Sequence, residues 1–417
     1  MNKDNLPKSL YLRQVPKILD EDRFSKDTST LQEARYEIID PEINKIWGFV
    51  TIDNTKRGPG LGGIRMAPKV GLNEVNRLAH VMTLKNSAAC LPYGGGKAGL
   101  LVNNAAVYDD REIKKKLIEK LSEALFDLKN YVPAADMGTD EQDIQVIYDH
   151  HSQKLQQGIH DRGGAGRPFE FGGIPLDDWE LTAHGLFAAA LTLENILDKF
   201  KLKKSKVVIQ GFGNVGCPTA TKLSQKGALI VGVSDIHCAL WNPKGLDLKE
   251  LSRIRKLPDG LNNYSQKVEK RFGPEKLDWL LEAPCDILVP AARPDAITAK
   301  NIDRINCSLV LQGANTPSSK PVEYYLKHRR NILSLTDFIV NAGGVIGCAV
   351  EQKIMQNKDY AKRVKDSDTR TYTEELIFNT VANNVKEVFS RIKGGYLFRD
   401  VATDLALERL QTKEVWL

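Results

Sequence analysis

The sequence predicts an α/β protein of two domains, of which the second is a doubly wound, Rossmann-type parallel sheet. Three observations favour this fold class. The chain has 417 residues, which is more than one compact hydrophobic core usually serves. Short apolar runs alternate with helical patterns, as βαβ units require. The composition, 42% hydrophobic and 27% charged, is that of an ordinary globular protein.

The first domain, an α/β domain, is expected over residues 1–181. Ile46–Val50 has the apolar character of a strand, and Glu74–Leu84 has the spacing of a helix. The basic run Lys114–Lys116 lies in a helical pattern whose apolar residues fall on one side, so we interpret it as a solvated helix face. Gly158–Pro175 is rich in glycine and weakly periodic, which predicts a loop or hinge.

The second domain is expected over residues 182–344. It begins with a helical pattern, Gly185–Phe200, and continues with Lys206–Gln210, an apolar run typical of a buried parallel strand. Further strands are predicted at Leu229–Val233, Ile287–Val289, Leu309–Leu311 and Ile332–Leu335. Between them lie helical patterns, so we expect a parallel sheet.

The C-terminal region is helical. Helices are predicted at Val345–Met355, Thr371–Ile392 and Val401–Leu410. No strand is predicted after them, and we expect residues 345–417 to return to the first domain.

Composition excludes several classes of protein. The net charge of +6 comes from 59 basic and 53 acidic residues scattered along the chain, which argues against a nucleic-acid partner. The six cysteines are widely spaced, without a CxxC pair, so we predict free thiols in a reducing compartment and no metal site. Met1–Thr30 lacks an apolar signal-peptide core, and no segment has the length of a membrane span. A cytoplasmic protein without a membrane partner is expected.

A dinucleotide site is predicted where Gly211-Phe212-Gly213-Asn214-Val215-Gly216 follows a strand and opens a helix. Gly211 would permit the tight turn, Gly213 would let the backbone reach a pyrophosphate, and Gly216 would allow close packing of helix on strand. Asp235 ends the next strand, where a carboxylate can bind ribose hydroxyls. This acid favours NAD; NADP is possible if a residue such as His237 compensates for its charge.

A lysine base is predicted at Lys97, which we place at the mouth of a glycine-dense loop, Gly94–Gly96. Three successive glycines would let the backbone approach a ligand. A lysine held against apolar residues loses its proton more readily, since burial disfavours the ammonium. Lys85 and Asp136 would complete the site. The alternative interpretation makes both lysines solvated charges and Asp136 a helix cap.

Together these motifs resemble the Glu/Leu/Phe/Val dehydrogenase family of amino-acid dehydrogenases. The matching segments are Gly58–Met66, Met82–Asn86, Leu91–Lys97, Val132–Thr139, Gly211–Gly216, Gln312–Asn315 and Asn341–Val345. They occur in the order typical of the family. The resemblance implies NAD(P)-dependent, reversible oxidative deamination of an L-amino acid to a 2-oxo acid and ammonia.

The resemblance also implies roles for individual residues. Lys97 would activate the water that attacks the imino intermediate, Asp136 would move a proton to and from the substrate nitrogen, and Lys85 would pair with the α-carboxylate. Other substrate contacts are implied at Leu61, Gly62, Met82, Ala135, Val345 and Cys348. Further cofactor contacts are implied at Thr182, Ala291, Ala292, Asn315 and Asn341, although each of these is also a plausible turn residue.

Leu61 indicates which class of amino acid the protein binds. Glutamate dehydrogenases of the family carry a lysine there, which pairs with the γ-carboxylate, and a serine at the place of Cys348. Since a buried carboxylate without a partner is costly, the sequence favours an apolar amino acid such as leucine, valine or phenylalanine. Glutamate is the alternative, because the chain's length and Arg57-Gly58-Pro59 resemble the glutamate branch and Lys56 offers a charge.

A third alternative is a catalytically idle, nucleotide-binding regulatory homologue. It is motivated by Gly172–Glu180, which replaces a serine- and arginine-bearing loop of glutamate dehydrogenases. For an active enzyme, the resemblance implies two domains flanking a cleft, with substrate binding and assembly in the first. It also implies a homo-oligomer, either a hexamer or an octamer.

Overall fold

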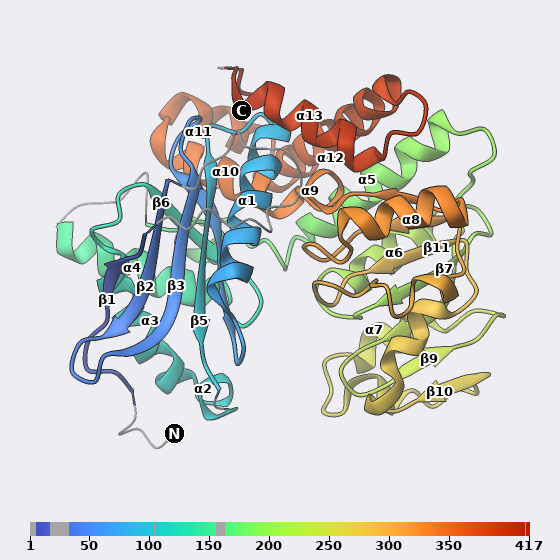
Figure 1. Cartoon of the computed structure of the whole chain (residues 1–417), viewed down its shortest axis with the longest axis horizontal. Coiled ribbons are helices and arrows are strands. Elements are labelled where there is room, and N and C mark those ends of the chain that lie inside the picture. Colours follow the sequence, from blue (N-terminus) through green and yellow to red (C-terminus); the bar gives the residue numbers. More distant parts are fainter. Residues whose placement is uncertain (1–5, 17–32, 104, 156–162, 413) are drawn as a thin grey trace. The chain divides into compact units, whose positions relative to one another are not determined.

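The structure is a computed structural model that describes residues 6–16, 33–103, 105–155, 163–412 and 414–417. The chain divides into two compact units, each with its own β-sheet (Figure 1). Unit 1 comprises Met1–Leu176, Val345–Tyr372 and Ala406–Leu417, and unit 2 comprises Asp177–Gly344 and Thr373–Leu405. The predicted fold class, two α/β domains with a Rossmann-type second domain, is confirmed.

Unit 1 is built on a six-stranded sheet in the order β1-β2-β3-β5-β4-β6. Its strands are β1 (Tyr11–Gln14), β2 (Ala34–Asp40), β3 (Lys45–Asn54), β4 (Gly60–Ala67), β5 (Gly94–Leu101) and β6 (Tyr131–Ala135). The pairs β1–β2, β2–β3 and β3–β5 are antiparallel, whereas β4 runs parallel to both β5 and β6. As a result, β5 and β6 are separated by one strand, β4.

Helices cover both faces of this sheet. They are α1 (Leu72–Ala88), α2 (Ala105–Asp109), α3 (Arg111–Leu125) and α4 (Glu141–Leu155), and the C-terminal α10 (Gly343–Gln356) and α11 (Lys358–Asp366) also belong largely to unit 1. On one face, Ala98 and Leu100 of β5 share an apolar core with Leu117 of α3 and Ile144 of α4. On the other, Gly99 lies against Val75 of α1. Because side chains alternate along a strand, Lys97 points to the α1 face.

One lysine of the predicted solvated face is buried, so that part of the prediction was wrong. Lys115 and Lys116 are exposed, but Lys114 is 7% exposed and its Nζ lies 2.6 Å from Asp143 Oδ2 on α4. The helical pattern was correct. It did not show that α4 places a buried carboxylate opposite one member of the run.

Unit 2 is built on a seven-stranded sheet in the order β10-β9-β8-β7-β11-β12-β13. Its strands are β7 (Lys206–Gln210), β8 (Leu229–Ser234), β9 (Ala239–Trp241), β10 (Lys270–Phe272), β11 (Ile287–Pro290), β12 (Leu309–Leu311) and β13 (Leu333–Leu335). From β8 to β13 in this order the strands are parallel, while β9 and β10 extend the sheet as antiparallel strands. The chain starts at β7 and extends the sheet to either side, which is the doubly wound topology.

The helices of unit 2 include the predicted ones, but the helix expected at Gly185–Phe200 begins and ends four residues earlier. They are α5 (Leu181–Ile196), α6 (Gly216–Gln225), α7 (Leu248–Ile254), α8 (Lys320–Arg330) and α9 (Asp337–Val340), with parts of α12 (Thr369–Arg391) and α13 (Phe398–Leu410). Short 3₁₀ segments are η2 (Phe169–Phe171, in unit 1), η3 (Gly260–Asn263), η4 (Pro274–Glu282) and η5 (Ile302–Arg304). The short strands β9 and β10 were not predicted.

The division of the chain differs from the expected one near the C-terminus. Residues 345–372 and 406–417 fall in unit 1, but residues 373–405 fall in unit 2. Polar contacts join this segment to α8: Arg399 forms an ion pair with Glu323, and His328 contacts the Gly395 carbonyl oxygen at 3.0 Å. The first boundary lies at 176/177 instead of 181/182. Of the predicted hinge, residues 158–162 lie outside the described residues.

The six cysteines are free thiols, as predicted. Among the helices in the described ranges, none is both long enough and apolar enough to cross a bilayer.

Candidate active site

The two residues predicted to transfer protons are neighbours in unit 1. Lys97 lies in the middle of β5, and Asp136 directly follows β6. Lys97 Nζ forms an ion pair with Asp136 Oδ2, and the lysine is only 2% exposed. The strand between them leaves room for this contact, because a Cβ at Gly63 would lie 3.1 Å from Lys97 Nζ and 2.7 Å from Asp136 Cβ. The ion pair therefore depends on a glycine in β4.

Arg65 of β4 is a third member of this site, and the sequence reasoning assigned it no role. Its Nε lies 3.5 Å from Asp136 Oδ2, and its Nη1 lies 2.6 Å from Glu74 Oε1 on α1. The residue is 3% exposed. An arginine within a run of glycines and apolar residues is unusual, and this was a signal that could have identified it.

The surroundings shift the pKa values of both reacting groups. Burial lowers the pKa of Lys97 below its ordinary value, and Arg65 adds to this effect, although Asp136 opposes it. For Asp136, burial alone would raise the carboxyl pKa, but Lys97 and Arg65 together hold that pKa well below its ordinary value. The site thus pairs an ionised carboxylate with an amine that releases its proton more readily than a free lysine does.

The glycines before Lys97 lie in β5 and form no ligand-binding loop, so that prediction was wrong. A Cβ at Gly94 would lie 1.7 Å from the carbonyl oxygen of Asn54, and one at Gly95 would lie 2.2 Å from Thr83 Oγ1 on α1. These contacts are internal to unit 1. The glycines are needed so that β3 and α1 can approach β5 closely, and this packing is what buries Lys97.

Five other residues implied in substrate binding lie on the same strands or on α1. Leu61 and Gly62 are on β4, Ala135 ends β6, and Met82 and Lys85 are on α1. Leu61 is fully buried, Lys85 is 5% exposed, and a Cβ at Gly62 would lie 3.2 Å from Met82 Cγ. These residues therefore lie on the unit 1 sheet that carries Lys97 and Asp136, or on the helix α1 that covers it.

Val345 and Cys348 lie on α10, and both are buried. The Cys348 Sγ lies 3.7 Å from the position of a Cβ at Gly166, and burial raises the pKa of this thiol well above its ordinary value. Glu351, one turn further, accepts the backbone N–H groups of Gly166 at 2.9 Å and Ile174 at 2.8 Å. Cys348 of α10 therefore lies beside Gly166, in a loop that Glu351 of the same helix binds.

The predicted dinucleotide turn in unit 2 has the expected geometry at each glycine. Gly211 follows β7 with a φ of +90°, which favours glycine. A Cβ added at Gly213 would have no heavy atom of the described residues within 4 Å beyond its chain neighbours, so the space beside this backbone is open. At Gly216, which begins α6, a Cβ would lie 1.9 Å from the Gly211 carbonyl oxygen. A turn, an open backbone and a close contact are the three features that a bound pyrophosphate needs.

Asp235 directly follows β8, as predicted, but its carboxylate already stabilises a turn. Oδ1 accepts the N–H groups of His237 at 2.8 Å and Cys238 at 2.9 Å, and Oδ2 accepts that of Leu261 at 2.7 Å. A carboxylate has about four acceptor positions, so a ribose hydroxyl would use the remaining one.

The other residues implied in cofactor binding lie at the carboxyl edge of the unit 2 sheet, defined as the ends of β7, β8, β11, β12 and β13. Ala291 and Ala292 follow β11, and a Cβ at Gly211 would lie 2.9 Å from Ala292 Cβ. Asn315 lies beyond the end of β12. In α6, Val215 is the N-cap, and Asn214 donates to Asp177 Oδ2 at 2.8 Å.

Asn341 and Thr182 complete this set. Asn341 Nδ2 donates to the carbonyl oxygens of Gly313 at 3.1 Å and Ala314 at 3.2 Å. Its Oδ1 is buried and has no hydrogen-bond partner in the described part of the chain, which suits a donor group of a ligand. Thr182 is at the start of α5, with Oγ1 3.3 Å from the position of a Cβ at Gly344. The residues present therefore fit a dinucleotide.

No metal site is found in the ranges that the structure describes: no three His, Cys, Asp or Glu side chains are grouped so as to hold an ion.

Two family models match most of the chain. Residues 172–413 match the Glutamate/Leucine/Phenylalanine/Valine dehydrogenase family, and residues 32–153 match the Glu/Leu/Phe/Val dehydrogenase, dimerisation domain. The chain is 32% identical over 380 residues to the NADP-specific glutamate dehydrogenase of Saccharolobus shibatae, covering 89% of this chain and 85% of that protein. It is 33% identical over 304 residues to the catabolic NAD-specific glutamate dehydrogenase of Bacillus subtilis, covering 72% and 68%.

Among solved structures, the hetero-hexameric glutamate dehydrogenase of Thermus thermophilus, in its Leu-bound form, aligns with a TM-score of 0.74 and 25% identity. The alignment covers 97% of this chain and 88% of that one. The chain therefore belongs to the Glu/Leu/Phe/Val dehydrogenase family and is an NAD(P)-dependent amino-acid dehydrogenase.

Proposed function

We propose that this protein catalyses the reversible oxidative deamination of L-glutamate to 2-oxoglutarate and ammonia. The main support for oxidative deamination is the buried ion pair of Lys97 and Asp136, in a chain that also has a complete dinucleotide turn. The relatives named above support glutamate as the substrate, since both curated ones are glutamate dehydrogenases.

In this proposal Lys97 acts as the base. Burial lowers the pKa of its amine, so that Nζ can take a proton from the water that adds to the imino carbon of the substrate. Asp136, held ionised by Lys97 and Arg65, exchanges a proton with the substrate nitrogen, which then leaves as ammonia. Lys85 would hold the α-carboxylate and so orient the Cα–H bond.

The dinucleotide would be held by the Gly211–Gly216 turn, the N-terminus of α6, Asp235 and Asn341. When bound, its nicotinamide supplies the hydride acceptor that the deamination requires. We propose NAD as the preferred form, because Asp235 would repel a 2′-phosphate.

A second candidate substrate is an apolar amino acid such as leucine, valine or phenylalanine. Leu61 favours it: this residue is fully buried on β4 and has no charge to offer a γ-carboxylate. A carboxylate buried without a partner costs several kcal/mol, about 3–5 when a pair is broken. If glutamate is the substrate, its γ-carboxylate must be bound by a cation other than residue 61.

Turnover of purified protein with a panel of amino acids, each with NAD⁺ and NADP⁺, tests the proposal. We expect glutamate to give the highest kcat/KM. A preference for leucine, valine or phenylalanine would replace glutamate with the second candidate. Dinucleotide binding without turnover of any amino acid would instead support the idle regulatory homologue.

A variant adds a second measurement. In Leu61→Lys the new ammonium would be available to a γ-carboxylate, so kcat/KM for glutamate should rise relative to leucine by roughly 10- to 100-fold. Leu61→Met, which conserves volume without charge, is the matched control. An unchanged ratio in Leu61→Lys would mean that residue 61 does not face the substrate side chain.

We also propose that the protein is a homo-oligomer, a hexamer or an octamer, assembled through unit 1. The match of residues 32–153 to a dimerisation domain supports this proposal. Light scattering coupled to gel filtration tests it, and a monomer at working concentration would refute it.

A further inference from the structure

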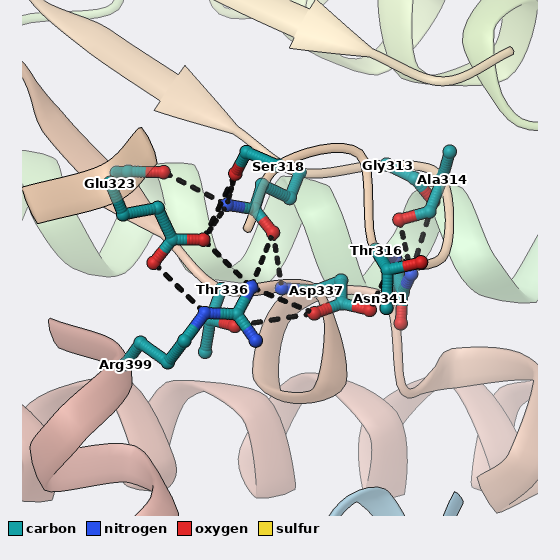
Figure 2. A network of polar contacts seen from close by, with 11 residues as sticks. Gly313, Ala314, Thr316, Ser318, Glu323, Thr336, Asp337, Asn341 and Arg399 are labelled. Atoms are coloured by element: carbon teal, nitrogen blue, oxygen red, sulfur yellow. Dashed lines mark hydrogen bonds and ion pairs between the residues drawn. The ribbon is translucent and has the colours of Figure 1, made fainter. Parts of the chain in front are cut away.

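A buried polar cluster in unit 2 connects the C-terminal segment with the carboxyl edge of the sheet (Figure 2). We call it the Arg399 cluster, and it consists of Gln312, Ser318, Glu323, Ser334, Thr336, Asp337 and Arg399. Gln312 follows β12, Thr336 follows β13, and Asp337 begins α9. Glu323 lies on α8 and Arg399 on α13, so the cluster joins elements far apart in the sequence.

Arg399 supplies the positive charge of this cluster. Its Nε lies 3.0 Å from Glu323 Oε2, and its Nη2 lies 2.7 Å from Glu323 Oε1, which is a two-bond contact. The same Nη2 lies 3.2 Å from Gln312 Oε1 and 3.5 Å from Asp337 Oδ1. The Glu323 and Asp337 side chains are 2% and 0% exposed, so both carboxylates are deprived of water. Without the guanidinium, two negative charges would be buried close together.

The cluster holds the loop that follows β12. Asp337 Oδ2 accepts the Thr316 N–H at 2.8 Å, and the Asp337 N–H donates to Gln312 Oε1 at 3.1 Å. Thr316 has a φ of +47°, a conformation that is unfavourable for a residue with a side chain and must be stabilised by its surroundings. The loop between Gln312 and Thr316 is also bound by Asn341. Its shape therefore depends on a carboxylate that Arg399 neutralises.

This loop lies on one side of the predicted dinucleotide site. A dinucleotide crosses the carboxyl edge at the strand where the sheet order reverses, which is β7, with its pyrophosphate on the Gly211 turn. Asp235, after β8, lies on one side of β7, whereas the loop after β12 lies on the other. If Asp235 marks the adenosine half, then the loop and Asn341 are next to the nicotinamide half.

We propose that Arg399 is a positioning residue for the nicotinamide half of the cofactor, acting through Asp337 and Gln312 on the Gly313–Thr316 loop and Asn341. This inference rests on the proposed function, because it assumes that NAD or NADP binds at the carboxyl edge. It predicts that loss of Arg399 weakens binding of the nicotinamide half and leaves binding of the adenosine half unchanged.

The experiment compares two ligands: the reduced dinucleotide and ADP-ribose, which lacks the nicotinamide ring. The variants are Arg399→Met, which removes the charge, and Arg399→Lys, which keeps a charge but cannot make the two-bond contact. Lys320→Met is the matched control, since the Lys320 Nζ pairs with Asp400 at 2.7 Å and so also connects α8 with α13, but at a more exposed position. Dissociation constants are measured by fluorescence or calorimetry on the folded oligomer.

We expect Arg399→Met to raise the dissociation constant for the reduced dinucleotide about tenfold, the factor that corresponds to loss of about one hydrogen bond. The constant for ADP-ribose should change by less than about twofold, and Lys320→Met should change neither. If Arg399→Met does not fold, the test uses Arg399→Lys. In that variant the ratio of the dissociation constant for the reduced dinucleotide to that for ADP-ribose should rise about threefold. KM for the dinucleotide should rise in parallel, with KM for the amino acid unchanged.

The inference would be overturned if Arg399→Met weakened the binding of both ligands equally or of neither. It would also be overturned if Lys320→Met changed the ratio of the two dissociation constants as much as Arg399→Met does. If the unaltered protein bound neither reduced dinucleotide nor ADP-ribose, the proposed function itself would fail. The two failures are therefore distinguishable.

Discussion

Replacing Lys97 with methionine removes the amine and keeps most of the volume of the side chain, so the change isolates the charge. The lysine side chain is 3% exposed and that of Asp136 is 12% exposed. Breaking a buried ion pair typically costs about 3–5 kcal/mol of unfolding free energy. Because Arg65 Nε remains 3.5 Å from Asp136, we expect a loss near the lower limit, about 3 kcal/mol. The rate should fall further, with kcat/KM reduced roughly 10²- to 10⁴-fold as a general base is lost.

The double variant with Asp136→Asn separates the two effects. Asp136→Asn alone leaves Lys97 buried without its partner, so it should cost about as much stability as Lys97→Met. The double variant removes both charges and should recover to within about 1 kcal/mol of the unaltered protein, while its kcat/KM stays as low as that of the worse single variant. Stability is measured by urea unfolding at fixed protein concentration, turnover by dinucleotide absorbance, and dinucleotide binding by fluorescence. Near-normal turnover of Lys97→Met would refute the assignment of Lys97 as the base, and strictly additive stability losses would refute the ion pair.

Two further predictions concern pH and the dinucleotide turn. Arg65 lowers the pKa of Lys97, so Arg65→Met should raise that pKa and move the rise of kcat/KM with pH to the alkaline side, with Arg65→Lys as the control. The stability of the protein should show the same effect. Because the pKa of Lys97 is lower in the folded state than in the unfolded state, where it is about 10.4, the free energy of unfolding should rise with pH between the two pKa values. In Arg65→Met the two pKa values lie closer together, so the pH range of this rise should be narrower. Gly213→Ala should change the free energy of unfolding by less than about 0.5 kcal/mol, since the new Cβ would contact no atom of the described residues. It should weaken dinucleotide binding, because the Cβ would occupy the space through which the backbone reaches the pyrophosphate. Gly216→Ala should instead destabilise the protein by roughly 1–3 kcal/mol, because its Cβ would overlap Gly211, and calorimetric melting of both variants checks the contrast.

The parts of the fold that depend on local pattern could be predicted from the sequence. The strands β7 and β12 were predicted to the residue, because a strand buried on both faces is a continuous apolar run. The turn at Gly211 and Gly216 was also predicted correctly from local sequence. Gly211 has a positive φ, and at Gly216 a Cβ would overlap the Gly211 carbonyl oxygen, so both positions require glycine. Local pattern alone did not distinguish a ligand loop from a tightly packed strand at Gly94–Gly96, because both require residues without side chains.

The parts that depend on contacts between distant segments could not be predicted. Arg399 and Glu323 are separated by 76 positions in the chain, and nothing near either residue indicates the other. The same holds for Lys114, whose buried partner Asp143 lies on the next long helix. Residues 373–405, which were expected with the first domain, fall in unit 2, where contacts of this kind join them to α8.

The late position of Arg399 has a consequence for how the chain is made. Protein synthesis proceeds from the N-terminus at about 5–20 residues per second, and domains begin to fold as they emerge. The strands of unit 2 are complete once Leu335 has been added, but the guanidinium that neutralises Glu323 and Asp337 is added much later, after the whole of α12. A nascent chain, or a protein truncated before residue 399, would therefore hold a formed sheet with two uncompensated acids at its cofactor edge. We expect such a chain to acquire a dinucleotide only near the end of its own translation.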